Sequence, residues 1–293
     1  MTTRRTVRFT DPEEGLQKIQ PSDTFSCFFV HKYVKELIST DFSNIQKLLQ
    51  HELSVNKNYA QRWQEATNKF QYKSKMSKLR TECQIAIIAY TMDSNLYADF
   101  NDKCRRLQGD NSWNNFPYKS LYALLARSIH DIDNDPPVTT KMFYRGMSHK
   151  VKNLKVGDCF FLKQFMSCTP VKHMATMFVK GSGTLMIFEG SPSAACGLAK
   201  LSDFPSEQEI LLFPWNVIRV TKIVSGQQQD NVHFETVESF VKDLPYSGNY
   251  KSRGIAVNNS GGNTGGAGAG NSDESSSYES SSDESSSDAC LIS

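Results

Sequence analysis

The order of hydrophobic patterns along the chain is the strongest constraint on its fold. Residues 22–135 carry apolar side chains at helical spacing, whereas residues 140–245 carry short apolar runs bounded by Gly, Pro, Asn and Asp. The short runs are rich in β-branched and aromatic residues, which is typical of strands. Helices followed by strands indicate an α+β domain rather than alternating α/β units. We therefore expect a helical part at 22–135 and a β-rich part at 140–245.

Three segments of the first part are expected to be helices. Residues 59–79 are polar and predict a solvent-facing helix, and residues 81–90 (TECQIAIIAY) are the most apolar segment and predict a core helix. Residues 118–132 place Leu121, Leu124, Leu125 and Ile129 on one stripe, which is the pattern of an amphipathic helix. In the second part, strands are expected at 142–145, 159–162, 165–169, 183–190, 207–213, 217–224 and 232–238, with one short helix at 171–179.

The two ends differ in composition from this body. Residues 1–21 are expected to form an N-terminal arm, and residues 246–293 are expected to be a disordered tail of Gly, Ser and acidic residues. Six of the 31 acidic residues lie at 272–288, so the rest of the chain holds 33 Lys and Arg against 25 acids. That excess is mild and forms no long basic cluster, so nucleic-acid binding is not expected.

The chain of 293 residues begins with a charged segment that lacks the apolar stretch of a secretory signal. Its seven cysteines include no C-x-x-C pair. Both features favour reduced thiols and an intracellular protein that is not secreted, at the cytoplasm or at a cytoplasmic membrane face.

Two short motifs in the β-rich part place polar groups where a ligand could meet them. Arg145 ends a strand-like run and precedes Gly146, so a fixed guanidinium fork lies beside a residue that permits close backbone approach. Ser167 and Thr169 share one face of an extended strand, and Cys168 lies on the other. Each motif alone is better explained by ordinary structure, as a surface arginine or as a hydroxyl pair on an edge strand.

A third motif is harder to explain by structure alone. Glu207 and Glu209 stand two positions apart, directly before the apolar run ILLFP. On a strand they would project to the same side, where two neighbouring carboxylates at a buried edge repel each other. Such an arrangement is costly in a purely structural sheet, so the pair is a candidate site in its own right.

Taken together, YRGM, FMSCT and FPSEQEILLFP resemble the Arg–Ser–Glu triad and Glu-x-Glu motif of arginine-specific mono-ADP-ribosyltransferases. Residues 86–105 and 116–129 are similar to the helical segment that precedes the first motif in that family, so the resemblance covers about residues 25–245. It departs from the usual Ser-Thr-Ser at Ser167-Cys168-Thr169. The resemblance implies a helical region followed by a two-sheet β core that forms an NAD cleft.

The resemblance also implies an activity: transfer of ADP-ribose from NAD to protein arginines, with release of nicotinamide and without a metal. Glu209 would stabilise an oxocarbenium-like transition state, and Glu207 would position the acceptor guanidinium. Arg145 would hold the phosphate and ribose region of NAD, Gly146 the carboxamide, and Ser167 the ribose and Glu209.

The loop at 200–206 would then recognise the target, with Phe204 as a possible aromatic contact or a packing residue. Two alternatives stay open. One is an NAD glycohydrolase, in which water replaces arginine. The other is an inactive binding module with the same fold. Cys168 and His173 are not expected to form a nucleophile–base pair, because Cys168 faces away from the hydroxyls.

The last four residues, Cys290-Leu291-Ile292-Ser293, match a prenylation box in which the terminal Ser favours a farnesyl group. A lipid on Cys290 would allow contact with a membrane surface, although one chain alone binds reversibly and the acidic tail would be repelled by anionic lipids. A chance match of four residues is the alternative.

Overall fold

The computed structural model describes residues 16–18, 33, 35–76, 79–107, 109–132, 142–189, 195–198, 200–214 and 216–238. The predicted tail with Cys290 lies outside the described residues, as does the predicted arm apart from residues 16–18. Among the described residues, no helix combines the length and the apolar character needed to cross a bilayer.

The helical part is confirmed as the first half of an α+β fold. The core helix predicted at 81–90 is α5, in which every residue from Cys83 to Thr91 is buried. The helix predicted at 118–132 is α8, and its buried face includes Leu121, Leu124 and Leu125. The helices of this part are α2 (Lys35–Ser39), α3 (Phe42–Val55), α4 (Lys57–Phe70), α5 (Thr81–Thr91), α6 (Asn95–Arg105), α7 (Asp110–Asn114) and α8 (Lys119–Ile132).

The expectation of a solvent-facing helix over 59–79 is wrong in two respects. Helix α4 ends at Phe70, and Tyr59, Ala66 and Phe70 on one of its faces are buried. The few apolar residues of this segment recur at helical spacing, so a mostly polar helix still packs one face against the core.

The β-rich part forms two sheets, as expected. The larger has the strand order β1-β3-β8-β9-β5-β2, and the smaller has the order β4-β7-β6. All neighbours are antiparallel except β5 and β9. The strands are β1 (Leu16–Lys18), β2 (Met142–Met147), β3 (Cys159–Leu162), β4 (Met166–Cys168), β5 (Gly183–Glu189), β6 (Ala195–Gly197), β7 (Ile210–Leu212), β8 (Val217–Val224) and β9 (Gln229–Glu238).

Strand β1 lies within the segment expected to be an N-terminal arm and pairs with β3. The helix expected at 171–179 is present as the shorter α9 (Lys172–Thr176). Both differences concern elements of five residues or fewer, whose hydrophobic pattern is too short to set their ends.

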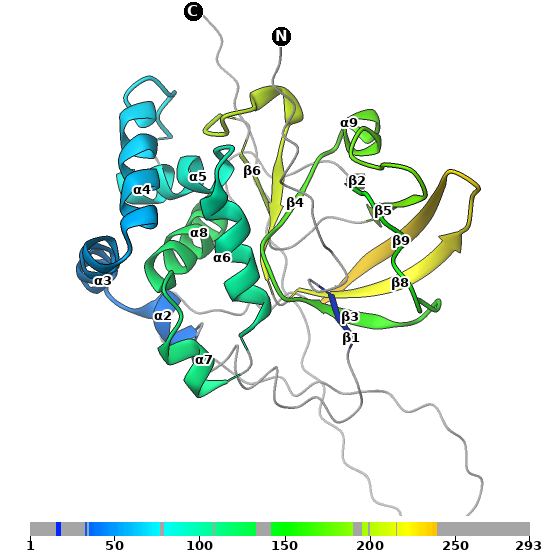
Figure 1. Cartoon of the computed structure of the whole chain (residues 1–293), viewed down its shortest axis with the longest axis horizontal. Coiled ribbons are helices and arrows are strands. Elements are labelled where there is room, and N and C mark those ends of the chain that lie inside the picture. The colour runs from blue at the N-terminus through cyan, green and yellow to red at the C-terminus, as the bar shows by residue number, and fades with distance from the viewer. Residues whose placement is uncertain are drawn as a thin grey trace, which may run out of the picture. The chain divides into compact units, whose positions relative to one another are not determined.

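The smaller sheet lies between the helices and the larger sheet (Figure 1). Alternation along its strands divides its side chains between two cores. Phe165, beside β4, and Leu211 of β7 pack with the helices, whereas Met166, Cys168 and Leu212 pack with the larger sheet. The helices pack on one face of the smaller sheet and the larger sheet packs on the other. Polar residues in or beside its strands are therefore held in fixed positions.

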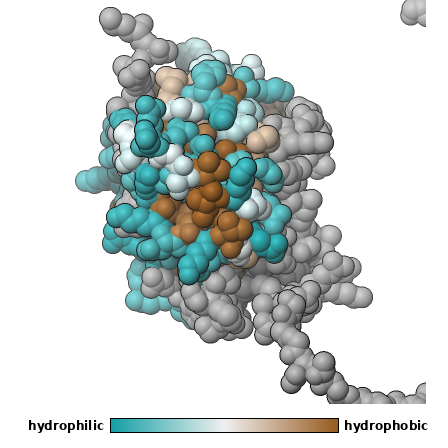
Figure 2. All heavy atoms as spheres, turned by 90° about the vertical axis from the view of Figure 1, so that its right-hand side faces the viewer, coloured by the Kyte–Doolittle hydropathy of each residue, from teal (hydrophilic) through white to brown (hydrophobic). Residues whose placement is uncertain are grey.

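The larger sheet has an outward face that α9 partly covers. There Ala175, Leu185 and Ile187 form a small buried cluster with Tyr144 and Val179 against it. Figure 2 shows apolar side chains gathered among polar ones on the face that lies to the right in Figure 1.

Candidate active site

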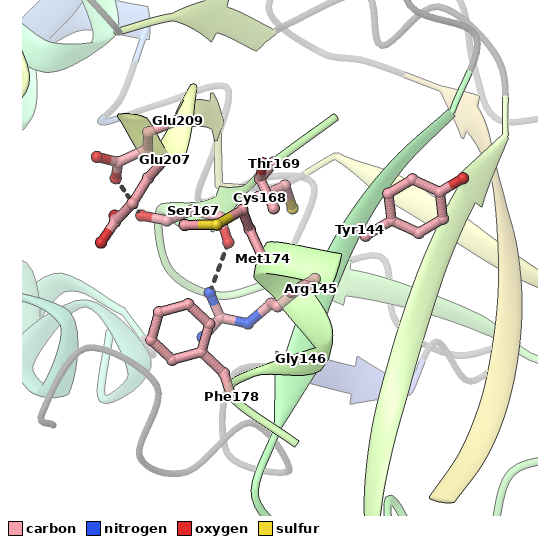
Figure 3. Close-up of a pocket in the computed structure, with 11 residues that line it drawn as sticks. Tyr144, Arg145, Gly146, Ser167, Cys168, Thr169, Met174, Phe178, Glu207 and Glu209 are labelled. Carbon is pink, nitrogen blue, oxygen red and sulfur yellow. Dashed lines mark hydrogen bonds between the residues drawn. The ribbon is translucent and has the colours of Figure 1, made fainter. Parts of the chain in front are cut away.

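Three residues from three segments of the β-rich part meet in one pocket (Figure 3). Arg145 comes from β2, Ser167 from β4, and Glu209 directly precedes β7. The Ser167 hydroxyl donates a hydrogen bond of 2.7 Å to Oε1 of Glu209, and Nη1 of Arg145 donates one of 2.9 Å to the Ser167 carbonyl oxygen. All three residues are about 2% exposed, so the charges of Arg145 and Glu209 act in a weakly screened environment.

A backbone bridge between the two sheets places Arg145 beside Ser167. The Tyr144 N–H donates to the Thr169 carbonyl at 2.7 Å, and the Thr169 N–H donates back to the Tyr144 carbonyl at 2.9 Å. Neighbouring residues on a strand face opposite ways, so Tyr144 turns away while Arg145 turns toward the carboxylates, as Figure 3 shows.

Phe165 anchors the start of β4 in the helical core. Its ring lies 5.2 Å from the Tyr122 ring and 5.4 Å from the Phe213 ring, and its carbonyl accepts a hydrogen bond from the Tyr90 hydroxyl. Aromatic pairs of this kind contribute about 1 kcal/mol each beyond their burial. Ser167 follows two positions later, so the helices hold the hydroxyl in place.

Glu209 is held by the loop that precedes it as well as by Ser167. The Leu198 N–H donates to the Glu209 carbonyl at 2.7 Å, and the Ser202 hydroxyl donates to Oε2 of Glu209 at 3.3 Å. Ser202 is fully buried. Ser202 belongs to the loop at 200–206, which also contains other polar residues. The sequence therefore offers no reason to single out Ser202 as a site residue.

The expectation that Glu207 and Glu209 project from one strand is wrong. Glu207 ends a 3-10 helix at Pro205–Glu207, Gln208 adopts a left-handed conformation at φ 46°, and β7 begins only at Ile210. Pro205 favours a turn at this point and Gln208 reverses the backbone direction, so the regular alternation of a strand is lost. Both carboxylates nevertheless line the same pocket, with Glu207 half-buried and Glu209 buried.

The pocket is lined by residues of β2, β4 and the segment that precedes β7. Part of its wall was not expected from the sequence: Met174, Ala175 and Phe178 come from α9 and the turn after it. Thr169 also lines the pocket, but its hydroxyl accepts a hydrogen bond from the Val171 N–H and is used locally. The signal for Phe178 was slight: one aromatic residue in a short helical segment.

Gly146 is required by packing inside the protein. A Cβ atom at this position would lie 1.8 Å from the Ala175 carbonyl oxygen, so β2 and α9 approach too closely for any side chain. Gly146 also lines the pocket, although it is buried.

Cys168 lines the pocket, but its thiol is unreactive at neutral pH. Burial raises the pKa of its thiol to about 12; the nearby Arg145 opposes this effect and Glu209 adds to it. The thiol therefore stays protonated at neutral pH and is a poor nucleophile. Among the described residues, no group of three or more His, Cys, Asp or Glu side chains could hold a metal ion.

Comparisons with known proteins identify the family of this chain. The sequence model of the family described as NAD:arginine ADP-ribosyltransferase matches residues 23–240. The chain is 28% identical over 185 residues to an erythroblast NAD(P)(+)–arginine ADP-ribosyltransferase of Gallus gallus, a match that spans 61% of this chain and 60% of that protein. It is also 28% identical over 210 residues to NAD(P)(+)–arginine ADP-ribosyltransferase 2 of Gallus gallus, across 67% of this chain and 63% of that protein. The chain thus spans a little under two thirds of the length of these relatives.

A solved structure shares the fold. The eucaryotic mono-ADP-ribosyltransferase ART2.2, in a complex with NADH, superimposes with a TM-score of 0.55 at 18% identity, covering 78% of this chain and 95% of that one. The helical part followed by two sheets is thus the fold of that enzyme. With the match over residues 23–240, the chain belongs to the NAD:arginine ADP-ribosyltransferase family.

Proposed function

We propose that this protein transfers ADP-ribose from NAD to the arginine side chains of other proteins and releases nicotinamide. The observation that carries the proposal is the hydrogen-bonded convergence of Arg145, Ser167 and Glu209 in one buried pocket, with Glu207 at its edge. The curated relatives are named for the same activity.

The proposed chemistry is a substitution at the anomeric carbon of the nicotinamide ribose. The bond from this carbon to the nicotinamide nitrogen breaks, and the nitrogen keeps the electron pair, so nicotinamide leaves neutral. Positive charge develops on the ribose, as in glycoside hydrolysis, and the Glu209 carboxylate stabilises it. An acceptor guanidinium nitrogen then bonds to the carbon and gives up a proton, which Glu207 can accept.

The other residues of the pocket bind and orient NAD in this proposal. Arg145 holds the phosphate and ribose region, because a guanidinium is suited to phosphate oxygens. The backbone of Gly146 meets the carboxamide of nicotinamide. Ser167 orients both Glu209 and the ribose. Phe178 and Met174 supply the apolar wall for a ring, as is usual in pockets that bind nucleotides and other small ligands.

A labelled-NAD assay with agmatine as the arginine-like acceptor tests the proposal. The wild-type protein should label agmatine, and Glu209→Ala should abolish the label while NAD binding persists. An inactive binding module would give no label with the wild-type protein, which would overturn the proposal.

Glu207 separates transfer from hydrolysis. Glu207→Gln should abolish agmatine labelling and leave nicotinamide release measurable. A guanidinium acceptor needs a carboxylate to position it, whereas attacking water does not. If Glu207→Gln leaves agmatine labelling intact, the assigned role of Glu207 is wrong. If wild-type protein releases nicotinamide but labels neither agmatine nor protein, the activity is that of an NAD glycohydrolase.

We further propose that the protein is intracellular and that Cys290 carries a prenyl group, which brings it to a cytoplasmic membrane face. The terminal sequence Cys290-Leu291-Ile292-Ser293 supports this. Mass spectrometry of the protein from its native host should show a lipidated C-terminus that lacks the last three residues. A full-length, unmodified C-terminus would contradict the anchor, and Cys290→Ser is the matched control for membrane fractionation.

A further inference from the structure

We propose that Ser202 is a second positioning residue for Glu209. The proposal rests on the function proposed above and adds a residue to its machinery. Its starting point is the hydrogen bond of 3.3 Å from the Ser202 hydroxyl to Oε2 of Glu209.

The two oxygens of the Glu209 carboxylate have different hydroxyl partners. Ser167 of β4 donates to Oε1 at 2.7 Å, and Ser202 of the preceding loop donates to Oε2 at 3.3 Å. The terminal torsion of a glutamate is broad and poorly fixed by its own sterics. Two donors from different segments remove that freedom, so the carboxylate plane is set before the substrate arrives. Such preorganisation is what electrostatic stabilisation of a transition state requires.

A second contact holds the Ser202 hydroxyl beside Glu209. The Phe204 N–H donates to the Ser202 oxygen at 3.2 Å. A hydroxyl has one proton to donate and can accept through its oxygen. An ionised carboxylate can only accept, so the Ser202 hydroxyl donates its proton to Glu209 while its oxygen accepts from the Phe204 N–H.

The backbone of Ser202 is itself fixed. Its N–H donates to the Leu198 carbonyl at 2.7 Å, and the Leu198 N–H donates to the Glu209 carbonyl at 2.7 Å. The side chains of Leu198 and Leu201 are both about 1% exposed in the core that contains the helices. The base of the loop is therefore rigid, whereas Pro205 and Ser206 at its tip are exposed.

Helix α4 and the turn after it fasten the same base from the side of the helices. Lys73 donates from Nζ to the Ser202 carbonyl at 2.8 Å and lies 3.7 Å from Oδ1 of Asp203. Lys69 forms an ion pair with Oδ2 of Asp203. Asp203 is only 14% exposed, so this pairing is better shielded from water than most surface ion pairs. These contacts fix Ser202 and Asp203 against the helical part, and with them the loop that contacts Glu209.

Steady-state kinetics of Ser202→Ala, with Ser128→Ala as the control at a buried hydroxyl of α8 outside the pocket, test the proposal. We expect kcat of Ser202→Ala to fall about tenfold, the effect of one hydrogen bond to a charged group, with the KM for NAD within about twofold of the wild type. Agmatine transfer and nicotinamide release should fall by the same factor, because both pass through the same transition state. Ser128→Ala should match the wild type.

Ser202→Cys guards against a folding defect, because cysteine nearly matches serine in shape while its thiol is a weak donor. It should show the same loss of kcat with an unchanged melting temperature and unchanged NAD binding. The proposal is overturned if either variant keeps wild-type kcat, or if transfer falls while nicotinamide release does not. A wild-type protein that cleaves no NAD would instead refute the proposed function itself.

Discussion

The Ser167 hydroxyl donates a hydrogen bond of 2.7 Å to Oε1 of Glu209, a residue 42 positions further along the chain. Both residues are about 2% exposed, and both belong to or adjoin the smaller sheet, where β4 and β7 pair directly. Pairing of these strands thus brings the Ser167 hydroxyl to the Glu209 carboxylate. Because both groups are shielded from bulk water, they form a hydrogen bond with each other instead.

Removal of this donor should weaken catalysis. Ser167→Ala is expected to lower kcat for nicotinamide release about 10- to 100-fold, because a hydrogen bond to a charged group contributes about 1.5–3 kcal/mol. Stopped-time assays of nicotinamide release measure the loss.

The matched control is Ser128→Ala, which removes another buried hydroxyl, one that donates to the Leu124 carbonyl in α8. It should leave kcat unchanged. Equal losses in the two variants would mean that stability, rather than positioning of Glu209, explains the effect of Ser167.

A methyl group at position 146 should separate β2 from α9. Gly146→Ala places a Cβ atom 1.8 Å from the Ala175 carbonyl oxygen, and relief of that overlap is expected to cost about 2 kcal/mol or more in the free energy of unfolding. Urea denaturation measures the change. Gly197→Ala is the control, since a Cβ atom there meets nothing within 4 Å. A Gly146→Ala protein as stable as Gly197→Ala would contradict the prediction that β2 and α9 leave no room for a methyl group.

Cys168 should resist alkylation in the folded protein. Burial raises the pKa of its thiol to about 12, and a thiol is reactive only as the thiolate, so at pH 8.5 almost none is reactive. Reactivity should appear only as the pH rises toward that pKa or as the protein unfolds. Iodoacetamide labelling followed by peptide mass spectrometry tests this, with the more exposed Cys159 as the internal comparison. Rapid labelling of native Cys168 at pH 8.5 would contradict the prediction.

Glu52 should be essential for the start of α8. Its carboxylate accepts hydrogen bonds from the N–H groups of Lys119 and Ser120 and from the Ser120 hydroxyl, although it lies on α3. Glu52→Ala leaves these donors buried without an acceptor and is expected to cost about 3 kcal/mol in the free energy of unfolding.

Glu65→Ala is the comparison for Glu52, because Glu65 on the surface of α4 pairs with Arg62 and should cost about 0.5 kcal/mol or less. Chemical denaturation of the two variants gives the difference. If the two substitutions prove equally costly, the cap on α8 contributes nothing measurable.

Much of this protein could be predicted from local sequence. The apolar stripe of Leu121, Leu124 and Leu125 and the continuous apolar run in α5 are patterns of a few turns, and both helices are present. Alternation correctly separated Phe165, which packs with the helices, from Met166 and Cys168, which pack with the larger sheet. Side-chain direction within a strand is a local property, so residue order alone determines it.

The tertiary structure alone decided how these segments meet. The short strands β1 and β6 show no usable pattern, and the left-handed turn at Gln208 moves Glu207 off the strand on which residue spacing had placed it. Ser202 reaches Glu209 because the loop at 200–206 folds against it, and Phe178 reaches the pocket because the turn after α9 lies beside it. Residue types and their periodicity record local preference, whereas contacts between distant segments depend on strand pairing and packing, which no short stretch of sequence encodes.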